Sequence, residues 1–127
     1  MRSNTTSEIG QQMESAACRY LAQHGLELIE RNFRTKGGEL DLVMRDNDSL
    51  VFVEVRYRAS SAHGLPAESI TPAKRRRLLH AARIYLKAFR LQPSCRFDVV
   101  TLAGTVDAPQ IGWIKAAFDA TGGPWSP

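Results

Sequence analysis

Cysteine is scarce in this sequence: Cys18 and Cys95 are its only two, and they lie far apart. That excludes a disulfide framework and a zinc site built from paired cysteine ligands. Hydrophobic runs are short as well, and none approaches the ~20 residues that a membrane-spanning helix requires. No apolar segment follows residues 1–7, so we expect no secretory signal. The expected compartment is the cytoplasm, with no membrane partner.

The composition is that of an ordinary globular protein. Of the 127 residues, 43% are hydrophobic and 24% are charged, which suits one domain with a two-layered core. We predict that this domain spans residues 1–118 and that the Gly/Pro-rich stretch 119–127 is a poorly ordered tail. The net charge of +4 permits nucleic acid as a partner without requiring it.

Two neighbouring segments, residues 38–45 and 50–58, alternate apolar and polar side chains as half-buried strands do. Leu40, Leu42 and Met44 are expected on one face of the first strand, with Asp41 on the other. The residues between the segments, 46–49, have turn chemistry. We therefore predict an antiparallel hairpin with its turn at Asn47 and Asp48.

This register brings two acidic side chains together. It pairs Asp41 with Glu54 and Glu39 with Arg56, and it puts Arg56 on the same face as Glu54. Directly opposed side chains lie roughly 5 Å apart, and like charges at that spacing destabilise a hairpin. A hard divalent cation between the two carboxylates would relieve the repulsion. The alternative is an outer face of solvated charges with weak ion pairs.

The remaining elements follow from periodicity and from caps. We predict a helix over residues 5–24, with Glu14 at the edge of its apolar stripe, and a strand over 26–34. A second helix is expected from Thr71, with Pro72 in its first turn, to Phe89. Further strands are expected over residues 96–102 and, as a short final one, 110–114.

Basic residues cluster around the predicted hairpin and at the start of the second helix. Arg34 and Lys36 lie close in sequence to Glu39 and Asp41, which indicates either charge balance or attraction of phosphate. Clustered cations and backbone N–H groups at a helix N-terminus suit a phosphate, although such a run is equally typical of a solvated helix face. The run in question is Lys74, Arg75, Arg76 and Arg77.

Taken together, the ordered motifs resemble the YraN-type family of small bacterial proteins, which are similar to restriction endonucleases and to archaeal Holliday-junction resolvases. The resemblance covers most of the chain, from about Gly10 to Leu102. Its segments are 10–21, with Gly10, Glu14, Ala17, Tyr20 and Leu21, then 31–34, 38–42, 51–58, 70–74, 82–86 and 96–99. It implies an α/β, restriction-endonuclease-like fold: a mixed central sheet with an antiparallel meander, flanked by helices.

The resemblance also implies a site and a chemistry. The residues implied as catalytic are Glu14, Asp41, Glu54 and Arg56. Asp41, Glu54 and the backbone carbonyl of Val55 would hold Mg²⁺ or Mn²⁺, with Glu14 binding through water or orienting a second ion. The implied reaction is metal-dependent hydrolysis of phosphodiesters in DNA, branched or single-stranded. Phosphate contacts are expected from Arg34, Lys36, Arg58 and residues 74–77.

Position 56 departs from the nuclease pattern, which carries lysine there. Arginine keeps its charge and can stabilise a phosphate, but it cannot act as a base at neutral pH. We therefore expect weak activity, which Arg56→Lys would raise. A catalytically weak or inactive nucleic-acid-binding module is one alternative, and a protein-interaction module is another. The sequence leaves open whether the chain forms a homodimer.

Overall fold

A computed structural model describes residues 6–58, 70–90 and 94–118. Along the chain the elements are α1 (Thr6–Gln23), β1 (Glu27–Thr35), β2 (Gly38–Asp46), β3 (Ser49–Arg58), α2 (Pro72–Ala88), β4 (Cys95–Ala103) and β5 (Gln110–Phe118). The predicted tail, residues 119–127, lies outside the described residues. Both predicted helices and all five predicted strands are present, and β5 extends four residues beyond its predicted end at Ile114.

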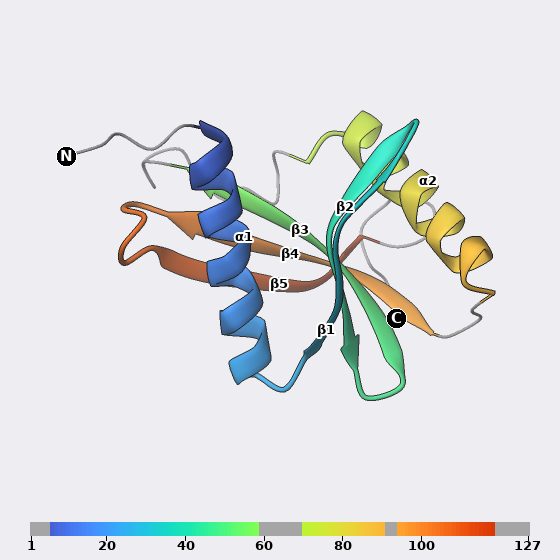
Figure 1. The fold of residues 1–127 in the computed structure, drawn as a ribbon, viewed down its shortest axis with the longest axis horizontal. Coiled ribbons are helices and arrows are strands. Elements are labelled where there is room, and N and C mark those ends of the chain that lie inside the picture. Colours follow the sequence, from blue (N-terminus) through green and yellow to red (C-terminus); the bar gives the residue numbers. More distant parts are fainter. Residues whose placement is uncertain (1–5, 59–69, 91–93, 119–127) are drawn as a thin grey trace.

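The strands form one mixed sheet in the order β1-β2-β3-β4-β5 (Figure 1). β1, β2 and β3 pair antiparallel, which confirms the predicted meander. β4 then pairs parallel to β3, and β5 pairs antiparallel to β4. The predicted α/β class is therefore confirmed, and the arrangement is consistent with a restriction-endonuclease-like fold.

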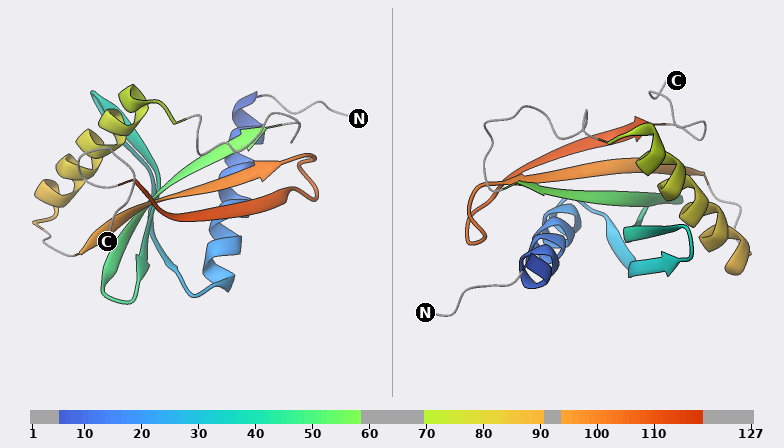
Figure 2. Two further views of the ribbon diagram at one scale, coloured as in Figure 1. Left: turned by 180° about the vertical axis from the view of Figure 1, so that it is seen from behind. Right: turned by 90° about the horizontal axis from the view of Figure 1, so that it is seen from above.

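Each helix buries its apolar stripe against a different cluster of the sheet. Met13, Ala17 and Leu21 of α1 pack with Val51 and Val53 of β3. On α2, the corresponding stripe is Leu78, Ala82 and Tyr85, which packs with Leu50 and Phe52 of the same strand. Strand β3 thus carries buried side chains on both faces, as a central strand must. Figure 2 shows α1 against the sheet towards one end of the molecule and α2 beside the β1–β2 hairpin towards the other.

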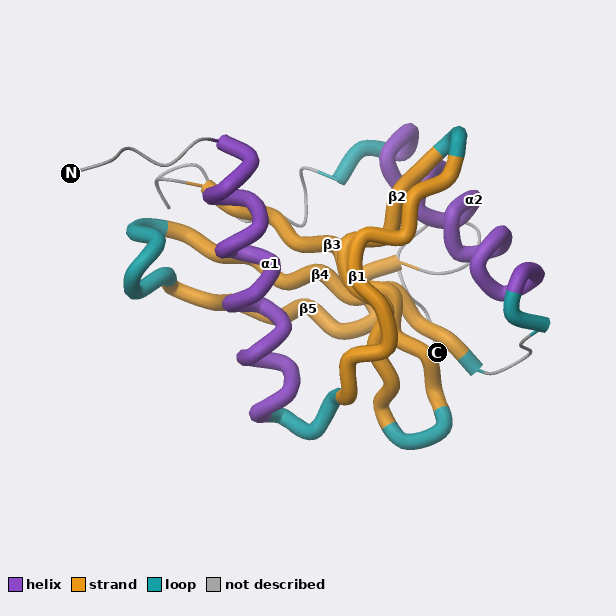
Figure 3. The backbone as a smooth tube through the Cα atoms, in the orientation of Figure 1, coloured by secondary structure: helices purple, strands orange, loops and turns teal. Residues whose placement is uncertain are grey.

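The β1–β2 hairpin bends sharply partway along its length. Asn32, which lies opposite Asp41 in the β1–β2 register, has a φ of 55°. A left-handed residue interrupts the alternation of a strand, and asparagine tolerates that conformation better than most residues. Arg31 accordingly contacts α1, whereas Phe33 packs on Tyr85 of α2. The tip of the hairpin reaches α2 (Figure 3).

Two details of the predicted hairpin are wrong because of this bend. Leu40 belongs to the cluster under α2, together with Val43, and not to the face that Leu42 and Met44 share. The predicted pairing of Glu39 with Arg56 is also absent from the described register, which joins β2 to β3 from Leu42↔Val53 to Asp46↔Ser49. Glu39 pairs with Arg34 of β1.

Neither described helix is long and apolar enough to cross a membrane.

Candidate functional site

The predicted register of the β2–β3 hairpin is correct over its paired length. Leu42 lies opposite Val53, and Asp46 lies opposite Ser49, as a turn at Asn47 and Asp48 requires. Asn47 has a φ of 56°, the left-handed conformation that turn asparagines adopt. Beyond Leu42 the strands separate, and the Val55 amide donates a hydrogen bond of 2.9 Å to Oδ2 of Asp41. The Asp41 side chain thus takes the place of the missing strand partner.

Asp41 and Glu54 lie side by side, as predicted, at the point where β2 leaves β3. Glu54 is only 5% exposed and Asp41 is half-buried, so the alternative of a solvated outer face is wrong for Glu54. Burial and the neighbouring Glu54 charge raise the pKa of Asp41 to about 8, with a further contribution from Glu14. The hydrogen bond from Val55 acts in the opposite direction, because it favours the charged carboxylate. A carboxyl group whose pKa is raised by burial and by a neighbouring acid, on the wall of a cavity, marks a candidate functional site.

Glu54 also contacts two cations. The Lys74 ammonium, in the first turn of α2, lies 2.8 Å from Glu54 Oε1. The nearest Arg56 guanidinium nitrogen is 3.9 Å from the same oxygen. A buried carboxylate is costly unless it is paired, so Lys74 supplies the close compensation that burial of Glu54 demands. The sequence placed Lys74 among phosphate contacts and gave no sign that it reaches Glu54.

Asp41, Glu54 and Lys74 line a cavity of about 610 Å³ between the hairpin tip and the start of α2. Asp41 and Glu54 contribute its acidic wall. The cations on its lining are Arg34, Lys36, Lys74 and Arg77. Four of the basic residues expected to contact phosphate therefore gather around the carboxylate pair. The cavity combines an oxygen-rich, acidic wall with a basic rim.

Two glycines determine how closely α2 approaches the hairpin. A Cβ atom on Gly38 would lie 2.2 Å from the Arg77 carbonyl oxygen, and one on Gly37 would lie 2.9 Å from the His80 ring. Such distances are far inside van der Waals contact, so no larger residue fits at Gly38 without moving the helix. Thr71 caps the helix by accepting a hydrogen bond of 3.1 Å from the Lys74 amide. The Thr71–Pro72 start follows from the sequence, whereas nothing in the sequence indicates that the two glycines lie against α2.

Glu14, on α1, has a partner of its own on β1. Its Oε1 is 3.4 Å from a guanidinium nitrogen of Arg31, which also donates to Ser15 Oγ at 3.1 Å. The Glu14 charge reaches Asp41, since it contributes to the raised pKa there. Among the described residues, however, no group of three or more His, Cys, Asp or Glu side chains is arranged to hold a metal ion. The structure therefore brings together two of the predicted acidic residues, and roles for Glu14 and the Val55 carbonyl stay predictions.

Three of the predicted phosphate contacts lie outside the lining of this cavity. Arg58 ends β3, opposite Ala103 of β4. Arg76 lines a neighbouring hollow with Arg77 and His80. Arg75 is half-buried in the first turns of α2. Their contacts with nucleic acid stay predictions, and the cavity gives no support for them.

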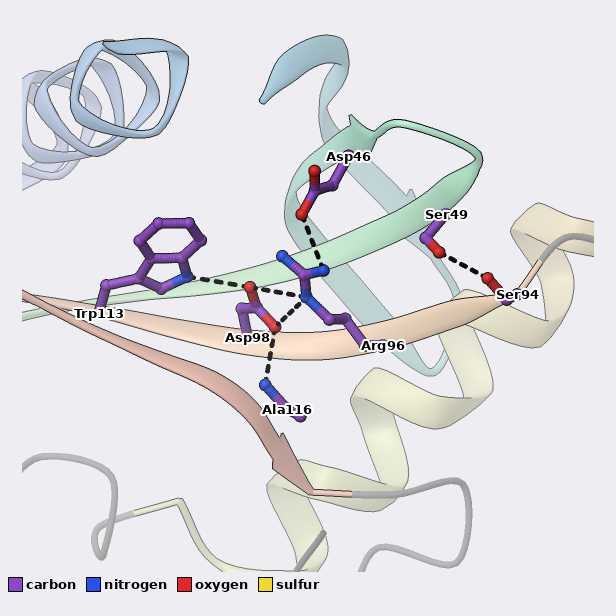
Figure 4. Close-up of polar contacts among 7 residues, drawn as sticks. All are labelled: Asp46, Ser49, Ser94, Arg96, Asp98, Trp113 and Ala116. Carbon is purple, nitrogen blue, oxygen red and sulfur yellow. Dashed lines mark hydrogen bonds and ion pairs between the residues drawn. The ribbon is translucent and has the colours of Figure 1, made fainter. Parts of the chain in front are cut away.

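A second buried carboxylate, Asp98 on β4, was not recognised from the sequence. It is fully buried and accepts hydrogen bonds from Arg96 Nε at 3.0 Å, Trp113 Nε1 at 2.9 Å and the Ala116 amide at 2.9 Å (Figure 4). Ala116 has a φ of 51°, at an irregularity in the β4–β5 pairing. Arg96 also donates a hydrogen bond of 2.9 Å from Nη1 to Oδ2 of Asp46. The only signal in the sequence was the placement of Arg96 and Asp98 two positions apart on one strand.

Comparison with known proteins finds a matching protein family. The model of a family described as "Uncharacterised protein family UPF0102" matches residues 13–102. A UPF0102 protein of Herminiimonas arsenicoxydans is 53% identical over 112 residues, which cover 88% of this chain and 87% of the relative. A UPF0102 protein of Chromohalobacter salexigens is 49% identical over 117 residues, covering 92% and 95%. Asp41, Glu54 and Lys74 all lie within the matched residues. The chain belongs to the UPF0102 family, which confirms the family resemblance inferred from its motifs.

Proposed function

We propose that this protein is a divalent-metal-dependent endonuclease-like protein that hydrolyses phosphodiester bonds in DNA, branched or single-stranded. The observation that carries the proposal is the Asp41–Glu54 pair on the wall of a cavity rimmed by cations. The pair supports a metal, the cations support a polyanionic substrate, and their shared cavity supports the use of both in one reaction.

The donor set suits Mg²⁺ or Mn²⁺. Mg²⁺ keeps several waters and is commonly bound by one or two carboxylates together with substrate phosphates, rather than by a closed protein cage. Asp41 and Glu54 match that requirement. The pKa of Asp41 is raised first by burial and then by the Glu54 charge, and a bound cation would offset both effects by favouring the charged carboxylate. When bound, a divalent ion supplies polarisation of a phosphate oxygen and lowers the pKa of water.

The protein's own groups would orient the substrate. Arg34 and Lys36, at the hairpin tip, and Arg77, on α2, approach the cavity from two sides and would bind phosphates flanking the scissile one. Hydrolysis adds one water across one P–O bond. The water oxygen forms the new bond to phosphorus, the bond to the leaving alkoxide breaks, and the proton lost by the water balances the one the alkoxide gains. Charge accumulates on the non-bridging oxygens, where fixed cations are most effective.

The decisive experiment is cleavage of branched and single-stranded DNA in the presence of Mn²⁺. Asp41→Asn keeps an oxygen that can accept from the Val55 amide but removes the charge, and we expect it to lower the cleavage rate by at least about 100-fold. Asp48→Asn is the matched control, because Asp48 is an exposed residue in the turn of the same hairpin. It should cleave as the wild type does.

A binding module without activity gives a different pattern. Equal background cleavage by the wild type and both variants, with DNA still bound, would favour the binding module over the nuclease. Binding itself is checked by a salt titration, in which the logarithm of affinity should fall with the logarithm of salt by about 0.9 per phosphate contact. Undetectable or salt-insensitive binding would favour the protein-interaction module.

A further inference from the structure

The basic residue closest to Glu54 comes from a different element than the sequence motif suggests. Lys74 Nζ lies 2.8 Å from Glu54 Oε1, within hydrogen-bond distance, whereas the closest Arg56 nitrogen is 3.9 Å away. Lys74 lines the cavity that holds Asp41 and Glu54, and Arg56 is not among the lining residues. The lysine that the nuclease pattern expects at position 56 thus has a spatial counterpart on α2.

The fold holds this lysine in place through the backbone. Lys74 lies in the first turn of α2, and its amide donates to the capping Thr71 hydroxyl. One turn further on, the close contact between Gly38 and the Arg77 carbonyl presses the helix against the hairpin tip. The start of α2 is therefore held against β2, and the Lys74–Glu54 ion pair joins it to β3.

We propose that Lys74 is the catalytic cation of this site: its ammonium contacts a non-bridging oxygen of the reacting phosphate, in the role that lysine fills at the position of Arg56 in the nucleases that the sequence resembles. This inference rests on the proposed function. An ammonium group is a compact charge with three donors. Lys74 can therefore keep one hydrogen on Glu54 and direct another at phosphate, where charge develops in the transition state.

A purely structural lysine would behave differently. If Lys74 served only to compensate buried Glu54, its loss would weaken the fold and disturb the Glu54 carboxylate, so metal binding would fall together with cleavage. If it contacts the phosphate, its loss removes a positive charge beside the metal position. Metal binding would then stay equal or become tighter while cleavage falls. The two roles separate on metal affinity, a readout that does not depend on turnover.

The test compares the wild type with Lys74→Ala, Lys74→Arg and Lys87→Ala. Lys87 is an exposed lysine in the last turn of the same helix and serves as the matched control. Three quantities are measured: the single-turnover cleavage rate with Mn²⁺, the Mn²⁺ affinity from its stabilisation of the fold, and the urea midpoint without metal. We expect Lys74→Ala to lower the rate by about 100-fold at equal or tighter Mn²⁺ affinity. Lys74→Arg should retain part of the rate, and Lys87→Ala all of it.

Several results would overturn the inference. A Lys74→Ala rate within about twofold of the wild type, or a lost rate accompanied by weakened Mn²⁺ binding, would exclude the phosphate contact. Arg56→Lys provides a further check. The sequence alone predicts that this change raises activity, but if Lys74 already fills the role, the rate should change by less than about twofold. A rise of about tenfold or more would assign the role to position 56.

Failure of the proposed function gives a different pattern. If the wild type binds DNA without cleaving it, the contact between Lys74 and phosphate is measured as Mn²⁺-dependent DNA affinity. Lys74→Ala should weaken that affinity by about tenfold. An unchanged affinity would contradict the contact. A wild type that binds neither Mn²⁺ nor DNA would refute both proposals. If Asp41→Asn abolishes activity while Lys74→Ala does not, only the inference about Lys74 fails.

Discussion

The molecule buries acidic side chains in two places, and their surroundings differ. Asp98 accepts hydrogen bonds from Arg96, Trp113 and the Ala116 amide, all held by strands β4 and β5. Asp41 and Glu54 face each other, and burial together with the Glu54 charge raises the pKa of Asp41 to about 8. The close cation beside Glu54 is a lysine from α2 that is 38% exposed.

This difference separates a structural carboxylate from a candidate ligand. Around Asp98, fixed donors already satisfy the charge, so a further cation would have no favourable position. Around Asp41 and Glu54, two acidic groups compete for compensation at the wall of an open cavity. Burial of an acidic residue alone therefore does not indicate a site. The indication is burial combined with a neighbouring acid and access to solvent.

The largest expected effect comes from Asp98→Asn, which makes the same chemical change as Asp41→Asn at the satisfied carboxylate. Removing one partner of a buried ion pair leaves the other uncompensated, and the new amide would point donors at donors. We expect the free energy of unfolding to fall by about 3 kcal/mol, measured by urea denaturation. A loss below about 0.5 kcal/mol would show that the network around Asp98 is not what stabilises this end of the sheet.

Gly38→Ala should have a smaller effect, of about 2 kcal/mol, because overpacking at a tight backbone contact forces the helix to move. The added methyl group would collide with the Arg77 carbonyl and push α2 away from the hairpin. Urea denaturation measures the loss, and we expect cleavage or DNA binding to fall with it. Gly10→Ala is the control, since nothing lies within 4 Å of a Cβ atom there. Equal stability of both variants would contradict the close packing of α2 on Gly38.

The third effect on stability has the opposite sign and is expected from Asp41→Asn without metal. The folded pKa of about 8 exceeds the ordinary value of 3.8, so the folded state binds the Asp41 proton more tightly than the unfolded state does. That contribution to stability is complete below about pH 4 and is lost as the pH rises to about 8. The neutral amide avoids the loss.

Urea denaturation of the wild type and Asp41→Asn should therefore give similar stability at about pH 4 and a variant that is more stable than the wild type at about pH 8. For Asp48→Asn, in the exposed turn, the difference in free energy of unfolding from the wild type should not change between about pH 4 and about pH 8. A variant that is less stable than the wild type throughout this range would contradict the repulsion between Asp41 and Glu54.

The parts of the fold that follow from local chemistry were predictable. The turn at Asn47 and Asp48 fixes the β2–β3 register up to Leu42 and Val53, and Asp41 and Glu54 are the next residues along the two strands. The Thr71–Pro72 start of α2 follows from capping preferences. The bend at Asn32 was not predictable, because asparagine tolerates the left-handed conformation without requiring it.

Contacts between distant segments account for the rest. Nothing in the spacing of Glu54 and Lys74 indicates that the start of a helix returns to a strand. The same holds for Arg96, which joins Asp46 of the hairpin turn to Asp98 of β4. Both interactions depend on how β3, α2 and β4 are arranged in space, which residue patterns along single elements do not specify.

The most direct test of the carboxylate pair as a metal site is the stability of the protein in Mn²⁺. An ion that binds only the folded state stabilises it by about 2.7 kcal/mol at a free concentration 100 times its dissociation constant. Urea denaturation across a Mn²⁺ titration should show this stabilisation in the wild type and in Asp48→Asn, and none in Asp41→Asn. An absence of stabilisation in the wild type, or equal stabilisation in Asp41→Asn, would contradict the site.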